Sequence, residues 1–575
     1  MNLVEQNELA RLIHLDKVGL QALARPIMKI LKLHDVNQVY QSLEELQGPA
    51  FIDALLEEYE VNFEYYAAEL KNIPKTGPFI TVSNHPLGGI DGLLLLKLLN
   101  TVRPDFKVMA NFLLQKVEPI KDYVMPVNPF ETKNVKSSYG GIKEAMRHVQ
   151  AGHGLGIFPA GEVSTYQFEE KRITDKAWED GAIKLIEKLG VPVVPIYFKA
   201  RNSAFFYLLS ILHPGLRTAK LPSELRQQKN KAVKIRIGRP IYPKELAGYK
   251  TTPHLKAFLR QRTYLLREAL PPAKKLFSLK RPVHPLPFQE AVPAERLKAE
   301  IQALRTKERR LIEQKSYEVF CASSEEIPQL LLELGRLREL TFRAIGEGTN
   351  RALDLDDFDF HYRHLLLWDK ETEQLAGAYR LGIGPEIYER FGINGFYVST
   401  LFKIKKGGRL LLQQGLEMGR AFVVPEHQQK PLPLFLLWQG IEAVLAAHPN
   451  LKYICGCASI SNVFSKFSQS LMVEFFLKNH GDANLTQFIK PRKAFKPKLK
   501  SKYQHQILNS TKSDLTQFDR IIENLEPGNL RVPVLIKKYL KLNARFVCFN
   551  VDPLFNNSLD GFMYIAVQDL EARNN

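Results

Sequence analysis

Short apolar segments alternate with helix-like segments over most of this chain, and that alternation constrains the fold more than any other feature. A first series begins with the strand-like PFITVSN (78–84), continues with the helix-like GLLLLKLL (92–99) and ends near VPVVPIYF (191–198). A second series runs from YEVFCA (317–322) to KYICGCASI (452–460). Strands that alternate with helices form a sheet covered by helices. The sequence therefore predicts an α/β fold with two such domains.

A change in composition separates the two series. Residues 251–320 contain 15 Lys or Arg against 7 Asp or Glu, and six prolines lie between 271 and 293. The 575 residues contain 45% hydrophobic side chains, which is enough for several cores. We expect four parts. A helical segment over 1–70 precedes an α/β domain over 71–270, and a basic, Pro-rich linker over 271–316, which ends in a solvated charged helix, leads to a second α/β domain over 317–575.

The chain is strongly basic, with a formal net charge of +19 from 80 Lys and Arg against 61 Asp and Glu. Such a charge favours anionic partners, but no nucleic-acid recognition motif is present, so we expect no nucleic-acid role. No apolar run reaches the roughly 18 residues of a membrane span, and the first residues do not resemble a signal peptide. We expect a cytoplasmic protein held peripherally on the inner face of the membrane by AFFYLLSIL (204–212), with Arg201, Arg217 and Lys220 beside it.

A histidine and an aspartate follow the first apolar strand, in SNHPLGGID (83–91). A carboxylate beside His85 would fix its tautomer and stabilise the imidazolium that forms when it acts as a general base. The glycines would let the backbone turn tightly and let a substrate approach. Taken alone, a His and an Asp six positions apart more often have a structural role.

Two further strand ends follow, in FPAGEVS (158–164) and VPVVPI (191–196). With the histidine block, over about residues 65–245, they resemble the glycerolipid acyltransferase family, whose members move fatty acyl chains from a thioester to a lysolipid hydroxyl. The resemblance implies that His85 deprotonates the acceptor and that Asp91 orients His85. It also implies a set of residues that bind the substrate, which are Asn84, Gly88, Phe158, Pro159, Gly161 and Glu162.

The chain departs from that family at several positions. Five residues separate His85 from Asp91 instead of four, as in the branch labelled hemolysin-type. Ala160, Glu162 and Val163 stand where the family has glutamate, threonine and arginine, and an arginine-bearing second motif is not recognisable around 127–130. Guanidinium groups fork onto phosphate oxygens, so their absence argues against a glycerol-phosphate acceptor.

The second series carries four charged motifs, which are LRELTFR (337–343), LDLDDFDFHYRH (353–364), GAYRL (377–381) and LEMGRAFV (416–423). Read alone, the acidic block is a solvated loop without the Gly and Glu of an EF-hand, and the arginines form ion pairs. Glu417 and Arg420 project to opposite faces of a strand unless a bulge intervenes.

The order of these motifs resembles the GNAT branch that holds acyl-homoserine-lactone synthases and ornithine-lipid N-acyltransferases, over about 320–470. The resemblance implies that Glu417 accepts a proton from an amine, and that Arg380 or Arg420 binds the carboxylate of an amino acid. It adds Arg343 to the residues that bind the substrate.

The acyl donor is expected to be a thioester of acyl carrier protein, with acyl-CoA as the alternative. The pyrophosphate loop of ordinary GNAT enzymes is not visible after Val423, and KPRKAFKPKLKSK (490–502), with seven cations and no acid, suits an acidic carrier. A solvated or membrane-facing loop explains the same run equally well. Neither site calls for a metal or redox cofactor, and the spacing of Cys455 and Cys457 fits neither a zinc knuckle nor a redox pair, so these cysteines are expected in the core.

Together the two resemblances imply a bifunctional bacterial aminolipid synthase, with a glycerolipid acyltransferase-like α/β domain and a GNAT-like α/β domain. One half would attach a 3-hydroxy fatty acyl chain to an amino acid, with ornithine slightly favoured over glycine, and the other would acylate the hydroxyl of that chain. Two alternatives stay open. One is a lysophospholipid O-acyltransferase with a non-catalytic regulatory C-terminal module, and the other is a non-enzymatic, hemolysin-like membrane protein. The sequence indicates no oligomeric state.

Overall fold

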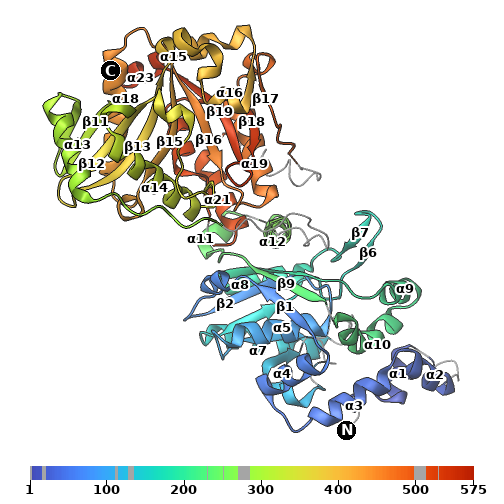
Figure 1. Ribbon diagram of the computed structural model, residues 1–575. Helices are drawn as coiled ribbons and strands as arrows, with labels where there is room; N and C mark the ends of the chain where they lie inside the picture. The colour runs from blue at the N-terminus through green and yellow to red at the C-terminus, as the bar shows by residue number, and fades with distance from the viewer. Residues whose placement is uncertain are drawn as a thin grey trace. The chain divides into compact units, whose positions relative to one another are not determined.

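The chain folds into two compact units, one of Met1–Leu270 with Pro527–Asn529 and one of Pro271–Glu526 with Leu530–Asn575 (Figure 1). Both are α/β, as the alternation of segments predicted. The structure is a computed structural model, and it describes residues 3–13, 15, 21–110, 114, 116–126, 135–229, 231–249, 251–269, 285–497, 513–528 and 530–574.

The first unit is built on a seven-stranded sheet with the order β1-β9-β8-β2-β5-β3-β4. Only β8 and β9 pair antiparallel among these neighbours, and the other pairs are parallel. The strands are β1 (Asn62–Tyr65), β2 (Phe79–Ser83), β3 (Lys107–Ala110), β4 (Val124–Pro126), β5 (Gly154–Ile157), β8 (Val193–Lys199) and β9 (Ala232–Ile237). A separate hairpin is formed by β6 (Thr165–Gln167) and β7 (Arg172–Thr174).

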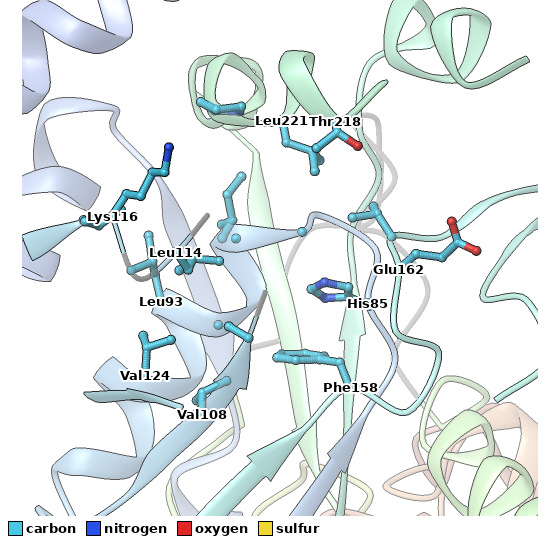
Figure 2. Close-up of a pocket in the computed structure, with 18 of the residues that line it drawn as sticks. His85, Leu93, Val108, Leu114, Lys116, Val124, Phe158, Glu162, Thr218 and Leu221 are labelled. Atoms are coloured by element: carbon cyan, nitrogen blue, oxygen red, sulfur yellow. The ribbon is translucent and has the colours of Figure 1, made fainter. Parts of the chain in front are cut away.

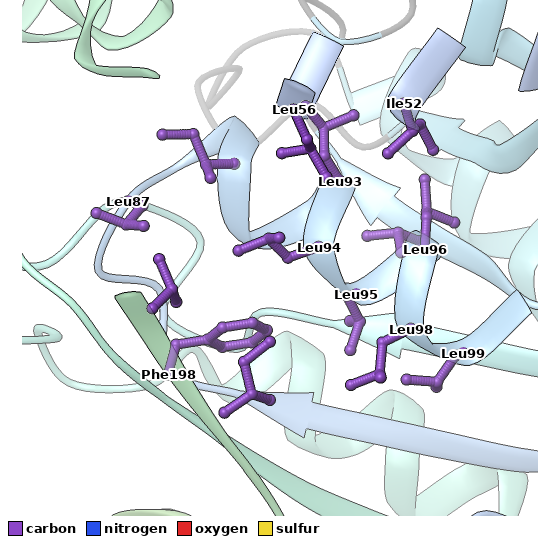
Figure 3. Packing of buried hydrophobic residues seen from close by; sticks show 14 of the residues in the cluster. Ile52, Leu56, Leu87, Leu93, Leu94, Leu95, Leu96, Leu98, Leu99 and Phe198 are labelled. Atoms are coloured by element: carbon purple, nitrogen blue, oxygen red, sulfur yellow. The ribbon is translucent and has the colours of Figure 1, made fainter. Parts of the chain in front are cut away.

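Helices cover both faces of this sheet. One core forms on α4 (Gly48–Glu58) and α5 (Gly89–Asn100), and the other on α7 (Val135–Gln150), α8 (Asp180–Leu189) and α12 (Thr252–Leu265). All five residues of β2 are buried, which explains its continuous apolar run. The leucines of α5 are buried all round the helix, with Leu93 and Leu96 near α4 and Leu94 and Leu95 on the side of Phe198 (Figure 3).

The N-terminal segment is mainly helical, with α1 (Gln6–Leu12), α2 (Ala24–Ile30) and α3 (Leu33–Leu43) before α4. Residues of α1 and α2 share a small core with α9 (Ala204–Leu212) and α10 (Pro214–Glu224). The prediction of helices throughout 1–70 is wrong at β1, which pairs with β9 at the sheet edge. That strand has four mostly exposed residues and forms through a distant partner, so no local apolar pattern reveals it.

The second unit contains an eight-stranded sheet with the order β10-β11-β12-β13-β15-β16-β19-β18. Its strands are β10 (Arg310–Gln314), β11 (Tyr317–Ser323), β12 (Arg363–Asp369), β13 (Gln374–Ile383), β15 (Gly415–Val423), β16 (Tyr453–Ile460), β18 (Arg545–Asp552) and β19 (Ser558–Ala566). One face carries α13 (Ala294–Thr306) and α14 (Pro328–Ala344), and α18 (Leu432–Ala447) packs on β11, β12 and β13. The helix α19 (Lys466–His480) contacts β18, and a small pair is formed by β14 (Phe402–Ile404) and β17 (Ile489–Pro491).

The centre of this sheet opens between β15 and β16, its only parallel neighbours among the described strands. Their pairing ends at Met418 and Gly456. Beyond that point β15 continues beside β13, and β16 continues beside β19. The two strands therefore diverge, and their ends present side chains and backbone groups to the space between them.

The charged helix expected in the linker belongs instead to the second unit. Leu297, Ile301 and Leu304 of α13 are buried in a core with Phe320 and Leu334. The helix is solvated on one face only, because its apolar residues recur at three- and four-residue steps. The Pro-rich stretch before 285 lies outside the described residues. Within the described chain, no helix has the length and apolar character needed to cross a membrane.

Candidate active sites

The loop between β2 and α5 brings His85 and Asp91 together. Asp91 lies in the first turn of α5, and its Oδ2 is 3.1 Å from Nδ1 of His85. The same oxygen accepts hydrogen bonds from the backbone N–H groups of Leu87 (2.8 Å) and Gly88 (3.0 Å). Burial raises the pKa of the Asp91 carboxyl, although His85 and these two donors lower it. The carboxylate thus faces Nδ1 and leaves Nε2 as the nitrogen that can accept a proton.

An aspartate that the sequence reading missed holds the histidine loop in place. Oδ1 of Asp175 accepts hydrogen bonds from the backbone N–H of His85 (3.1 Å) and the hydroxyl of Ser164 (2.5 Å). The Trp178 indole donates to its other oxygen at 3.2 Å. The backbone N–H of Ser164 also donates to the His85 carbonyl at 2.8 Å. Asp175 stands 90 positions from His85, so nothing local in the sequence points to this role.

Asn84 fastens the same loop to the sheet. Its amide donates to the Phe198 carbonyl at 2.9 Å and accepts from the Phe198 N–H at 2.7 Å, and it is 3% exposed. It is not among the residues that line the pocket next to His85. The structure therefore places Asn84 behind the site, where it positions the loop, and not at the place expected for a substrate contact.

Gly88 is needed at the turn for two reasons. Its φ is +79°, a conformation that residues with a side chain rarely adopt. A Cβ atom there would also lie 2.9 Å from the side chain of Leu221 and 3.1 Å from that of Val163. A larger residue would strain the turn that carries His85 and push the Leu221 and Val163 side chains aside.

An apolar pocket of about 780 Å³ opens beside His85 (Figure 2). Such a volume is typical of sites that bury a small molecule. The ring of Phe158 lies 4.3 Å from the imidazole ring, between centroids, on the pocket wall. Most lining side chains are apolar. Those from the N-terminal helices, α5, β3 and α10 include Leu9, Val36, Phe51, Leu93, Leu96, Val108 and Leu221. The pocket suits a long apolar chain.

Of the other predicted positions, Pro159, Gly161 and Glu162 also line this pocket. The carboxylate of Glu162 lies 2.7 Å from both Arg217 and Lys176. Burial alone would raise the pKa of Glu162, but the two cations hold it below its ordinary value. Glu162 is therefore an anion paired with two cations, and neither cation was predicted as a site residue.

The second unit gathers charged residues from three elements into a network beside β15. Three arginines, one each from α14, β13 and β15, form ion pairs with three aspartates of the acidic block. The arginines are Arg338, Arg380 and Arg420, and the aspartates are Asp354, Asp356 and Asp359. The shortest separations are 2.7 Å for Arg338–Asp359, 2.5 Å for Arg380–Asp356 and 3.0 Å for Arg420–Asp356. Three positive charges thus meet three negative ones. Among the described residues, no group of side chains is arranged to hold a metal ion.

Glu417 and Arg420 lie on one side of β15 despite their spacing. The register with β13 shifts near Arg380, and Arg420 has a φ of +51°, which makes the bulge that the sequence reading required. Glu417 accepts hydrogen bonds from the Tyr362 hydroxyl (2.5 Å) and the Val398 N–H (2.9 Å). Burial raises the pKa of Glu417 to about 6, although these hydrogen bonds lower it.

The three predicted residues Glu417, Arg380 and Arg420 meet around Tyr397. The guanidinium of Arg420 lies 4.7 Å from the centre of the Tyr397 ring, and that of Arg380 lies 5.1 Å from it. The backbone N–H of Tyr397 donates to the Tyr362 hydroxyl at 2.9 Å, which in turn binds Glu417. The sequence reading missed both tyrosines, because each acts through contacts distant in sequence.

Arg343 lies in a different place and holds a segment of the fold. It pairs with Glu339 at 2.8 Å and donates to the carbonyl of Arg351 at 2.7 Å. Its guanidinium also stacks on Phe288 at 4.1 Å. The described structure shows Arg343 apart from the group around Tyr397.

Comparison with known proteins identifies both units. Residues 4–273 match an acyltransferase family, and residues 337–439 match the acetyltransferase (GNAT) domain family. The chain is an acyltransferase with a C-terminal GNAT domain. This confirms the predicted enzyme class and pair of domains, and it argues against the non-enzymatic, hemolysin-like alternative.

Three similar proteins show what such sequences do elsewhere. The glycine N(alpha)-acyltransferases of Bacteroides thetaiotaomicron and Phocaeicola vulgatus are each 27% identical to this acyltransferase. The first match covers 48% of the chain and 85% of the relative, and the second covers 45% and 81%. The lyso-glycine lipid O-acyltransferase of Bacteroides thetaiotaomicron is 27% identical, over 42% of the chain and 88% of the relative.

Proposed function

We propose that the chain makes an acylated amino-acid lipid in two steps. The GNAT domain attaches a 3-hydroxy fatty acyl chain to the α-amine of an amino acid, and the N-terminal domain then acylates the hydroxyl of that chain. Similarity to an N-acyltransferase and to an O-acyltransferase within one chain supports this order. The names of these relatives make glycine the first amino acid to test, with ornithine beside it.

The O-acylation rests on the His85–Asp91 pair at the apolar pocket, which is the observation that carries the proposal. Nε2 of His85 takes the proton of the acceptor hydroxyl, and the oxygen attacks the thioester carbonyl carbon. The new C–O bond forms as the C–S bond breaks, and the leaving thiolate takes the proton from His85. Asp91 stabilises the imidazolium between these events. The pocket holds a fatty chain during the reaction.

The N-acylation is assigned to the group around Tyr397. The amine nitrogen attacks the thioester carbonyl carbon, so that a C–N bond forms as the C–S bond breaks. We propose that Glu417 takes the proton that the amine loses, directly or through water, and passes it to the leaving thiolate. Arg420 and Arg380 already hold aspartates, so an incoming carboxylate would have to share or displace these partners. No metal or redox cofactor enters either step.

We propose acyl carrier protein as the donor, with acyl-CoA as the alternative. Of the basic run 490–502, residues 498–502 lie outside the described residues. The described part includes Lys490, Arg492, Lys493 and Lys496, which suit an acidic carrier. Comparison of the two thioesters as substrates of the purified chain tests this assignment.

We propose that α9 holds the protein on the inner face of the membrane. Its exposed side chains recur along one face, with Phe205 40%, Leu208 54%, Ile211 65% and Leu212 66% exposed. The neighbouring α10 lines the pocket, so a lipid acceptor would have a short route to His85. Of the three cations expected beside this face, Lys220 is buried and bonds Ser223, and Arg217 pairs with Glu162. The proposal therefore rests mainly on apolar contact.

Expression in a bacterium without aminolipids, followed by mass analysis of its lipids, tests the function. The wild-type chain should yield a diacylated amino-acid lipid, and His85→Ala should leave the monoacylated form. If the wild type changed only the acyl chains of phospholipids, the alternative of a lysophospholipid acyltransferase with a non-catalytic C-terminal module would replace the proposal. Loss of all N-acylation in a well-folded His85→Ala variant would contradict the proposal that the two acylations occur at separate sites.

A further inference from the structure

Three buried acidic residues lie where the sheet of the GNAT domain opens. Glu347 follows α14, Asp552 ends β18, and Asp560 stands on β19. They are 8%, 1% and 8% exposed. None of them belongs to the network of arginines and aspartates around Tyr397, and none was singled out from the sequence.

Glu347 is fixed against the end of β16. The hydroxyl of Ser459 donates to its carboxylate at 2.7 Å. The loop that carries Glu347 is held by Ser461, which donates to the Ile345 carbonyl at 2.7 Å, and by Asn556, which donates to the Gly346 carbonyl at 3.0 Å. Ser459 lies three residues beyond Gly456, where β16 parts from β15. The carboxylate therefore sits beside the opening of the sheet.

Asp560 stands directly opposite Ser459 in the ladder between β16 and β19, and opposite Asn550 in the ladder with β18. Within the part of the chain that the structure describes, no hydrogen bond or ion pair reaches its carboxylate. Asp552 lies two positions beyond Asn550 on the same face of β18, and the Tyr397 hydroxyl is 3.5 Å from its carboxylate. An unpartnered buried carboxylate is costly, so the place calls for a ligand.

Negative charge on Glu347 and Asp560 is poorly compensated, which favours their protonated forms while no cation is bound. Arg420 is the cation that attracts Asp560, but it already pairs with Asp354 and Asp356. Burial raises the pKa of Asp560 well above its ordinary value, and the charges of Asp552 and Glu347 add to this effect. Burial raises the pKa of Glu347 to about 7, although the Ser459 hydrogen bond lowers it. A cation bound among the three would remove the mutual repulsion.

We propose that Glu347, Asp552 and Asp560 form the site that binds the amino group of the acceptor amino acid. The inference rests on the proposed N-acylation, and it adds the place of the amine to that reaction. An ammonium group has three donors, and three carboxylates present acceptors for them. From this site the amine lies next to the Tyr397 hydroxyl and Arg420, so both ends of a small amino acid meet groups of opposite charge.

Steady-state N-acylation by the full chain tests the site, with glycine and ornithine each varied at a fixed acyl thioester. Asp560→Asn and Glu347→Gln should raise the KM for the amino acid at least tenfold and leave the KM for the thioester unchanged. Asp369→Asn is the matched control, because Asp369 is also buried in this unit but ends β12, which β13 separates from the strands of the opening. Methylamine, which carries the cation alone, should compete with the amino acid in the wild type and lose this effect in Asp560→Asn.

The outcomes separate the inference from the function on which it rests. A wild-type chain that acylates neither amino acid overturns both. Normal N-acylation with an unchanged KM in Asp560→Asn and Glu347→Gln overturns the site alone. A purely structural role predicts a lower melting temperature with an unchanged KM, whereas removal of an unpaired buried charge should keep or raise the melting temperature. If chelators abolished N-acylation and a divalent cation restored it, the three carboxylates would bind a metal ion instead of the amine, and the proposal would be refuted.

Discussion

Replacement of Asp91 by asparagine tests the first site most directly, because the change removes a charge and keeps a shape. An asparagine oxygen can still accept the N–H groups of Leu87 and Gly88 that hold the carboxylate now. The attraction between the carboxylate and a protonated His85 is lost. With charge centres about 4 Å apart and an effective dielectric constant of about 20, that attraction is worth about 4 kcal/mol. O-acylation should therefore fall about a thousandfold, since each 1.4 kcal/mol is worth roughly a factor of ten.

The assay is O-acylation of supplied monoacyl lipid by Asp91→Asn, with N-acylation by the same sample as an internal control. The melting temperature should stay unchanged or rise, because Asp91 is fully buried and its pKa is already raised by burial. O-acylation within tenfold of the wild type, with normal folding, would refute the assignment of Asp91 to His85.

Three further predictions concern the rest of the chain. Glu417→Gln should lower N-acylation at least tenfold while O-acylation stays intact, because glutamine can still accept from the Tyr362 hydroxyl and the Val398 N–H but cannot take the proton of the amine; equal loss in both half-reactions would contradict this. Leu208→Glu with Ile211→Glu should abolish co-sedimentation with anionic vesicles at an unchanged melting temperature, and continued binding would exclude α9 as the contact. Burial raises the pKa of Glu347 from its ordinary value of 4.5 to about 7, so the folded state keeps this proton longer than the unfolded chain and stability falls as pH rises through that window. Urea unfolding should show the wild type losing up to about 3 kcal/mol relative to Glu347→Gln, and parallel pH profiles would contradict the raised pKa.

The sequence was sufficient for elements that are apolar along their whole length. Central strands such as β2 are continuous apolar runs, and α5 follows as an apolar helix, so both were predictable. The edge strand β1 was not, because its partner β9 lies far along the chain. The packed face of α13 was overlooked because charged residues surround its apolar stripe of Leu297, Ile301 and Leu304. Pattern alone shows which residues are apolar, and it does not show which distant segment covers them.

Whether a site residue could be predicted also depended on how far apart in the sequence its partners lie. His85 and Asp91 share one loop, so their meeting could be predicted from six positions of sequence. Asp175 reaches the same loop from 90 positions away. In the GNAT domain the motifs indicated the charged residues. Read alone, the arginines were expected to form ion pairs, whereas the family resemblance assigned Arg380 and Arg420 to the substrate. Arg380 instead holds Asp356, which could not be known before the acidic block was placed in space.

The balanced network of three arginines and three aspartates has a consequence for how this domain can change. Loss of one member leaves a buried charge without its partner, at a cost of about 3–5 kcal/mol. Simultaneous loss of an opposite charge restores neutrality at a much smaller cost. Among natural or selected variants, charges at these six positions should therefore disappear in matched pairs and rarely one at a time. A double-substitution library would record this as strong epistasis confined to Arg338, Arg380 and Arg420 and their aspartates.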